Sequence, residues 1–187
     1  MELSDVVADI AQALVAIDSS HAPFKSFQPG VGPYGEPQLL RAVVQHMNTL
    51  PAYDGTARTQ RTPDLLLPRR WSIEVKLARP FGDNGKEAEN WSVNLLHPYE
   101  GSTSLIGDCL KLEKLDGSER KAAVVVGYEH TPPQIRLAPL LRAFEVVATD
   151  VVGLKISHRQ QIVRTGLVHP VHQQLTVAAW ELLGRVV

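Results

Sequence analysis

The stretch that most constrains the fold of this chain runs over residues 61–79. It consists of two short apolar segments joined by a Pro-Arg-Arg turn, a pattern that predicts a β-hairpin. Three ionisable residues interrupt the apolar pattern: Asp64, Glu74 and Lys76. Because side chains alternate between the two faces of a strand, Glu74 and Lys76 share one face. A hairpin centred near Arg69 would also set Asp64 opposite Glu74.

This pairing would bring two carboxylates and an ammonium group to one point of the hairpin. Cross-strand partners have Cβ atoms only about 5 Å apart. Carboxylates that close repel each other unless a cation lies between them. Mg²⁺ prefers such oxygen ligands and commonly also binds waters and substrate phosphates. The pattern therefore predicts a Mg²⁺ site, and Mn²⁺ is a candidate substitute.

The predicted site lies in a locally basic part of a chain with a formal net charge of −1. Between residues 54 and 79 there are six basic side chains and three acidic ones, which leaves a local charge of +3. Local clustering of this kind matters more for nucleic-acid binding than the total charge. Each arginine could instead belong to a solvated hairpin rim. The candidate phosphate contacts are Arg58, Arg61, Arg69 and Arg70.

The composition is that of an ordinary globular protein. The chain has 187 residues, of which 44% are hydrophobic and 21% charged, which favours one domain spanning residues 1–187. Cys109 is the only cysteine, so an internal disulfide is excluded, and its apolar surroundings predict a core position. The N-terminal residues lack a signal-peptide pattern, and no apolar run approaches the length of a membrane span. We expect a cytoplasmic, soluble protein with no membrane partner.

Apolar periodicity predicts an α/β protein. Glu36 begins one of the predicted helices, where the helix dipole favours a carboxylate, so it is either a helix-start residue or a third acid of the metal site. The pair His169 and His172 has no third ligand nearby and suits a helix cap or a surface position. The predicted helices cover residues 2–17, 36–47, 103–115, 138–148 and 172–183, and the predicted strands outside the hairpin cover residues 121–128, 151–156 and 161–165.

The order of helix, strands bearing Pro-Asp and then Glu-x-Lys, helix and strand resembles the PD-(D/E)XK nuclease superfamily. The matching residues are Pro63-Asp64 and Glu74-Val75-Lys76, and Glu36 matches the acid that many members carry on the preceding helix. The resemblance covers about residues 36–128. It implies a restriction-endonuclease-like core, in which a central mixed β-sheet is flanked by helices, with additions at both termini.

A second Glu-x-Lys sequence, Glu119-Arg120-Lys121, has no preceding Pro-Asp. We interpret it as a solvated strand edge.

The resemblance also implies a chemistry. Asp64, Glu74 and the Val75 carbonyl would bind Mg²⁺, and Lys76 would orient or deprotonate the attacking water, with Glu36 as a further catalytic acid. The expected activity is that of a Mg²⁺-dependent DNA endonuclease of restriction type acting on duplex DNA. Cutting both strands would favour a symmetric homodimer.

Three alternatives stay open at this point. The first is a structure-specific repair or recombination nuclease. The second is a catalytically inactive binding or scaffolding module that keeps the nuclease fold. The third is an ordinary α/β interaction protein in which Glu-x-Lys is accidental.

Overall fold

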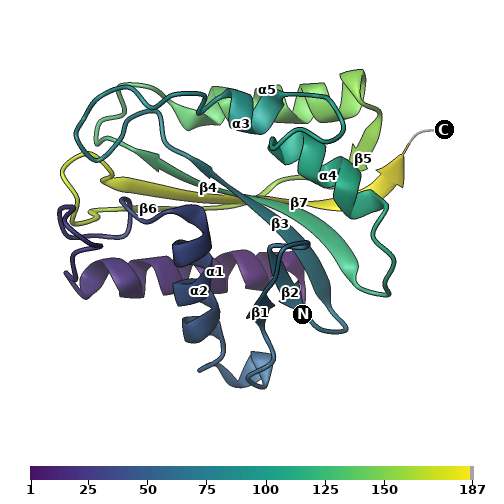
Figure 1. The fold of residues 1–187 in the computed structure, drawn as a ribbon, viewed down its shortest axis with the longest axis horizontal. Helices are drawn as coiled ribbons and strands as arrows, with labels where there is room; N and C mark the ends of the chain where they lie inside the picture. Colours follow the sequence, from purple (N-terminus) through teal and green to yellow (C-terminus); the bar gives the residue numbers. More distant parts are fainter. Residues whose placement is uncertain (186–187) are drawn as a thin grey trace.

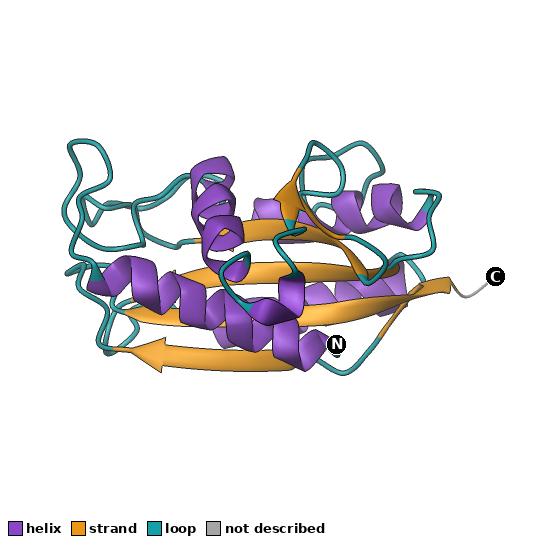
Figure 2. Cartoon of the chain, turned by 90° about the horizontal axis from the view of Figure 1, so that it is seen from below, coloured by secondary structure: helices purple, strands orange, loops and turns teal. Residues whose placement is uncertain are grey.

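The computed structural model describes residues 1–185, which form a mixed seven-stranded β-sheet with helices on both faces (Figures 1 and 2). The α-helices are α1 (Leu3–Ser19), α2 (Glu36–Met47), α3 (Val93–Leu96), α4 (Leu105–Glu113) and α5 (Leu137–Val146). A short 3₁₀ helix, η1 (Pro51–Tyr53), follows α2, and a π-helix, η2 (Val147–Val151), continues α5. The strands are β1 (Arg58–Thr59), β2 (Leu65–Leu67), β3 (Trp71–Ala78), β4 (Arg120–Glu129), β5 (Leu154–Ile156), β6 (Gln160–Thr165) and β7 (Gln174–Arg185). The predicted α/β class, with a central mixed sheet flanked by helices, is confirmed.

The strand order is β1-β2-β3-β4-β7-β5, and β6 also pairs with β7. β3 and β4 pair in parallel, and the connection between them carries α3 and α4. The other pairs are antiparallel. β1 and β2 therefore form one edge of the sheet. β2 pairs with β3 only from Trp71 to Ile73, so the rest of β3 has no strand partner on that side.

Helices α1 and α2 cover one face of the sheet and helices α3, α4 and α5 cover the other (Figure 1). Alternate residues of β3 follow this division. Trp71, Ile73 and Val75 pack toward α1 and α2, whereas Ala78 packs toward α3, α4 and α5. Burial from both sides explains the continuous apolar run of β4, since a central strand has no solvent-facing side. The same alternation turns Glu74 and Lys76 toward α4.

The prediction of a helix over residues 172–183 is wrong, because residues 174–183 belong to strand β7. Leu175, Val177 and Ala179 pack on the α1 and α2 side, while Ala178 and Trp180 pack on the other. With both faces buried, the run from Val177 to Trp180 carries no polar residue to mark a period of two. A short, uniformly apolar run cannot be told from a buried helix by its periodicity.

The other predicted helices and the strands over residues 121–128 and 161–165 lie within two residues of the observed bounds, and the second helix begins and ends at the predicted residues. The strand predicted over residues 151–156 is shorter, because Val151 ends η2 and β5 begins at Leu154. None of the helices between residues 1 and 185 combines the length and apolarity that a bilayer crossing requires.

Candidate functional site

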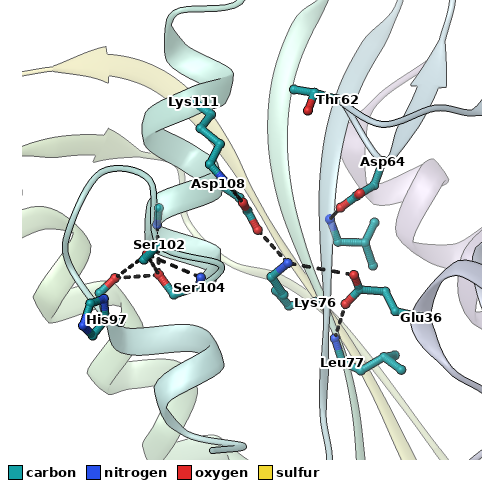
Figure 3. A network of polar contacts seen from close by, with 12 residues as sticks. Glu36, Thr62, Asp64, Lys76, Leu77, His97, Ser102, Ser104, Asp108 and Lys111 are labelled. Carbon is teal, nitrogen blue, oxygen red and sulfur yellow. Dashed lines mark hydrogen bonds and ion pairs between the residues drawn. The ribbon is translucent and has the colours of Figure 1, made fainter.

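The hairpin of β2 and β3 has the register that the sequence predicts. Leu65 pairs with Ile73 and Leu67 pairs with Trp71, so the residue before β2, Asp64, lies beside Glu74. Glu74 and Lys76 occupy the face of β3 that looks toward α4, and Figure 3 shows Lys76 between Glu36 on one side and Asp108 on the other. The structure therefore brings together four residues that the sequence singled out: Glu36, Asp64, Glu74 and Lys76.

Two of these carboxylates take the place of a strand partner for β3. The ladder with β2 ends at Ile73, and beyond it the Val75 N–H donates to Oδ2 of Asp64 at 2.9 Å. The Leu77 N–H then donates to Oε2 of Glu36 at 3.2 Å. Hydrogen bonds from backbone N–H groups to a carboxylate are among the stronger ones in proteins. Because both backbone groups of a strand residue face the same edge, the Val75 carbonyl points toward Asp64 as well.

Glu74 is buried next to another acid. It is only 4% exposed, although it lies at a site of concentrated charge. Burial raises the pKa of Glu74 well above its usual range, and hydrogen bonding to Asp64 and repulsion from Asp64 and Asp108 raise it further. A cation bound between Glu74 and Asp64 would remove this cost.

Lys76 forms two ion pairs. Its Nζ lies 2.7 Å from Oδ2 of Asp108 and 3.9 Å from Oε1 of Glu36. Burial lowers the pKa of Lys76, but Glu36 and Asp108 outweigh that effect, so the net pKa is raised. Glu36 shows the converse balance: burial raises its pKa, and the charge of Lys76 partly offsets the increase. Lys76 is therefore held as an ammonium group between two acids.

Asp108 is a part of the site that the sequence analysis missed. It lies on α4 with a side chain only 7% exposed, and Oδ1 accepts from Nζ of Lys111 at 2.7 Å while Oδ2 faces Lys76. One sequence feature could have identified Asp108: its carboxylate interrupts an otherwise apolar helix, between Ile106 and Cys109. A buried charge of this kind is costly unless it is paired.

The end of β3 also fixes the start of α2. Nη1 of Arg79 donates to the carbonyl oxygens of Gly32 at 2.6 Å and Tyr34 at 3.1 Å. Both residues lie in the loop before α2, so Arg79 anchors the loop that delivers Glu36 to the edge of β3. The C-terminal end of α2 is anchored to the segment before β1 by Asn48, whose side chain both donates to and accepts from the Ala57 backbone at 2.9 Å. The helix carrying Glu36 is thus held at both ends.

Two open pockets meet at Glu36. The first has a volume of about 330 Å³ and lies between α2 and the segment from β1 to β2. The second has a volume of about 240 Å³ and includes Lys76. Glu36 lines both, so a chain-like ligand crossing from one to the other would pass the charged cluster. The first pocket is lined by Glu36, Pro37, Leu40, Arg41, Thr59, Gln60, Arg61 and Asp64.

The structure divides the predicted phosphate contacts into two groups. Arg61 lines the first pocket, where Arg41 of α2 joins it, whereas Arg58 is exposed on β1 and its charge acts on Glu119 beside the hairpin turn. Arg69 and Arg70 lie in the turn at the opposite end of the hairpin from Asp64, and Arg70 donates to the Ala52 carbonyl. Arg61 therefore shares a pocket with Glu36 and Asp64 of the charged cluster, whereas Arg69 and Arg70 lie at the other end of the hairpin.

His169 and His172 do not occupy a helix cap or the surface. They lie in the loop before β7, are 0% and 2% exposed, and stack with ring centroids 4.7 Å apart. Nε2 of His172 is 2.9 Å from the Phe81 carbonyl oxygen. Burial lowers the pKa of both rings, that of His172 to about 4, so the pair belongs to the packed interior.

The donor set suits a hard divalent cation that keeps part of its water shell. Within residues 1–185, no three His, Cys, Asp or Glu side chains lie together as a preformed metal centre. The two adjacent acids Asp64 and Glu74, with the Val75 carbonyl on the same edge, offer fewer ligands than a closed centre. Mg²⁺ is typically bound by one or two carboxylates together with waters and substrate phosphates, so these residues fit it.

Comparisons with protein-family models, with curated proteins and with solved structures found no match to this chain.

Proposed function

We propose that this protein is a Mg²⁺-dependent DNA endonuclease that hydrolyses phosphodiester bonds. The observation that carries the proposal is the convergence of Glu36, Asp64, Glu74 and Lys76 along the part of β3 that β2 does not pair with, where two pockets meet. This is the residue set of the superfamily that the sequence resembles. In a site of restriction-endonuclease type, these four residues would act together in one hydrolytic step.

In this proposal, Asp64 and Glu74 hold the metal ion together with the Val75 carbonyl. When bound, Mg²⁺ would polarise the scissile phosphate and lower the pKa of a coordinated water. Lys76 would donate hydrogen bonds to that phosphate or water and offset the negative charge that builds up during attack. Lysine suits this role because its ammonium group carries three N–H donors, and the neighbouring acids keep it protonated. Mn²⁺ has similar ligand preferences and is expected to replace Mg²⁺.

The direct test is a cleavage assay on plasmid and linear duplex DNA with Mg²⁺, with Mn²⁺ and with EDTA. Lys76→Ala is expected to lose about 10²–10³-fold in rate, the usual cost of removing one donor that stabilises developing charge. Lys155→Ala is the matched control, because Lys155 is exposed on β5 at the other edge of the sheet. Metal-dependent cutting that survives Lys76→Ala unchanged would remove Lys76 from the mechanism.

A second candidate function is a noncatalytic binding module that keeps the same fold. The observation in its favour is that Lys76 is already paired with Asp108 and Glu36, while Asp64 and Glu36 accept backbone hydrogen bonds. Such a module would neither cut DNA nor gain thermal stability from Mg²⁺. A metal-induced rise in melting temperature that depends on Glu74 would instead favour the enzyme.

A further inference from the structure

The second pocket, of about 240 Å³, adjoins the charged cluster but differs from it in chemistry. It shares Glu36 and Lys76 with the cluster, and its other walls include Leu77, Trp91 and Asn94. An aliphatic side chain, an indole and an amide are the kinds of group that bind a flat, partly polar ring. This combination of groups suits a nucleobase better than a phosphate.

Trp91 distinguishes the pocket from the rest of the molecule. Trp71 and Trp180 are both 0% exposed, whereas Trp91 is half-buried and lines the pocket wall. Its ring also packs on the core between the sheet and α4, which holds it in place. Unpaired bases stack readily on exposed aromatic rings that are held in this way, with little dependence on sequence.

Two polar groups could orient a base stacked there. Arg79 is fixed by its hydrogen bonds to the Gly32 and Tyr34 carbonyls, and it forms no ion pair with any carboxylate within residues 1–185. The side-chain amide of Asn94 offers both a donor and an acceptor, which is the pattern that reads a base edge. The Arg79 guanidinium and the Asn94 amide could thus each form a hydrogen bond to a bound nucleotide.

The charges of the pocket argue against a phosphate inside it. Glu36 and Glu89 balance the charges of Lys76 and Arg79 in the pocket lining, so the pocket offers a phosphate no net positive charge and suits a neutral base. Because Lys76 also lines it, a base in the pocket would belong to a nucleotide next to the phosphate at the charged cluster. We infer that this pocket binds one unpaired nucleobase of the substrate strand, so that the nuclease acts on single-stranded or locally unpaired DNA. The inference rests on the proposed function for the position of the phosphate.

A base inside a duplex would have to leave its stack and its partner before it could enter the pocket. That cost is smallest for a strand that is already unpaired. The preferred substrate is therefore expected to be single-stranded DNA or a frayed end, with intact duplex bound and cut more weakly.

The test uses the full chain carrying Glu74→Gln, which removes a proposed metal ligand without altering the pocket wall. An oligothymidine strand is titrated in Mg²⁺ while tryptophan emission is recorded. Because Trp71 and Trp180 are fully buried, quenching on binding is expected to come from Trp91. Adding Trp91→Phe should abolish the quenching and keep most of the affinity, whereas Trp91→Leu should weaken binding on the order of tenfold. Melting temperatures of both variants check that each folds.

A parallel cleavage assay of the unsubstituted protein keeps the two ideas separable. Oligothymidine annealed to its complement should bind more weakly than the single strand and be cut more slowly. Cleavage without quenching, or equal binding by Trp91→Leu, would overturn the base pocket and leave the nuclease in place. Quenching without cleavage in Mg²⁺ or Mn²⁺ would uphold base binding and overturn the nuclease.

Discussion

Nζ of Lys76 lies 2.7 Å from Oδ2 of Asp108, closer than the 3.9 Å that separates it from Glu36. The nearest partner of the proposed catalytic lysine is thus a residue of α4, outside the sequence pattern that identified the site. Asp108 touches Lys76 rather than the expected position of the phosphate, so we assign it a positioning role.

Asp108→Asn is expected to lower kcat about tenfold to a hundredfold with little change in KM, because a catalytic group displaced by about 1 Å loses effect of that order. Steady-state cleavage kinetics test this. Lys111→Gln is the control, since Lys111 binds the other oxygen of Asp108 and does not contact Lys76. Equal loss in both variants would point to a general disturbance of α4.

Glu36 has two separable roles, one toward the Leu77 backbone and one through its charge. Glu36→Gln keeps an oxygen that can accept the Leu77 N–H, so its melting temperature should stay near that of the wild type while its cleavage rate falls. Glu36→Ala should also lose stability, because an unmade hydrogen bond to a buried backbone group costs about 1–3 kcal/mol. Thermal denaturation and cleavage rates, measured together, test both roles. Full cleavage activity in Glu36→Gln would leave Glu36 as a helix-start residue only.

The raised pKa of Glu74 predicts how stability depends on pH in the absence of metal. The folded protein binds a proton at Glu74 more tightly than the unfolded chain does, so the free energy of unfolding falls as pH rises above 4.5, up to the folded-state pKa. Glu74→Gln should remove this component, so in EDTA it should raise the melting temperature more at about pH 8 than at about pH 5. Mg²⁺ should then stabilise only the wild type. Equal effects of the substitution at both pH values would contradict the prediction.

The two groups of arginines predict different salt dependence. Arg61→Gln should weaken DNA binding and reduce the slope of log K against log salt by about one, the value expected for one lost phosphate contact. Arg69→Gln should leave that slope unchanged, because Arg69 lies in the far turn of the hairpin. Binding titrations over a range of salt concentrations measure both. A larger change from Arg69→Gln would move the nucleic-acid path to the other end of the hairpin.

His172 predicts an acid-sensitive component of stability unrelated to catalysis. Its folded-state pKa of about 4 lies below the ordinary 6.5, mainly because of burial, so the unfolded chain binds more protons between these values. The free energy of unfolding should therefore decrease as pH falls from 6.5 toward 4, by about 3 kcal/mol for this group. His172→Gln should flatten that part of the stability curve. Denaturant melts of both proteins over this pH range measure the effect. If the His172 ring were already charged in the folded protein, the wild type and His172→Gln would show the same pH dependence of stability.

The sequence predicted what depends on local pattern. The helix over residues 36–47 and the pairing of Asp64 with Glu74 follow from periodicity and from the centre of one hairpin. Strand β7 was missed because burial on both faces removes the alternation that marks a strand. Asp108 was missed for a different reason: it is far from Lys76 in sequence, and only the crossover from β3 to β4 brings α4 over the site.

Asp64 and Glu36 each complete the edge of β3 by accepting a backbone N–H. Selection for stability would therefore retain these two residues even in a chain that had lost catalysis, because the sheet edge depends on them. Within residues 1–185, the side chains of Glu74 and Lys76 make no hydrogen bond to the backbone. Selection would therefore retain these two residues only for the function of the charged cluster. Among divergent descendants of such a chain, the pair Glu74 and Lys76 would therefore mark working enzymes, whereas Asp64 and Glu36 would persist in inactive ones as well.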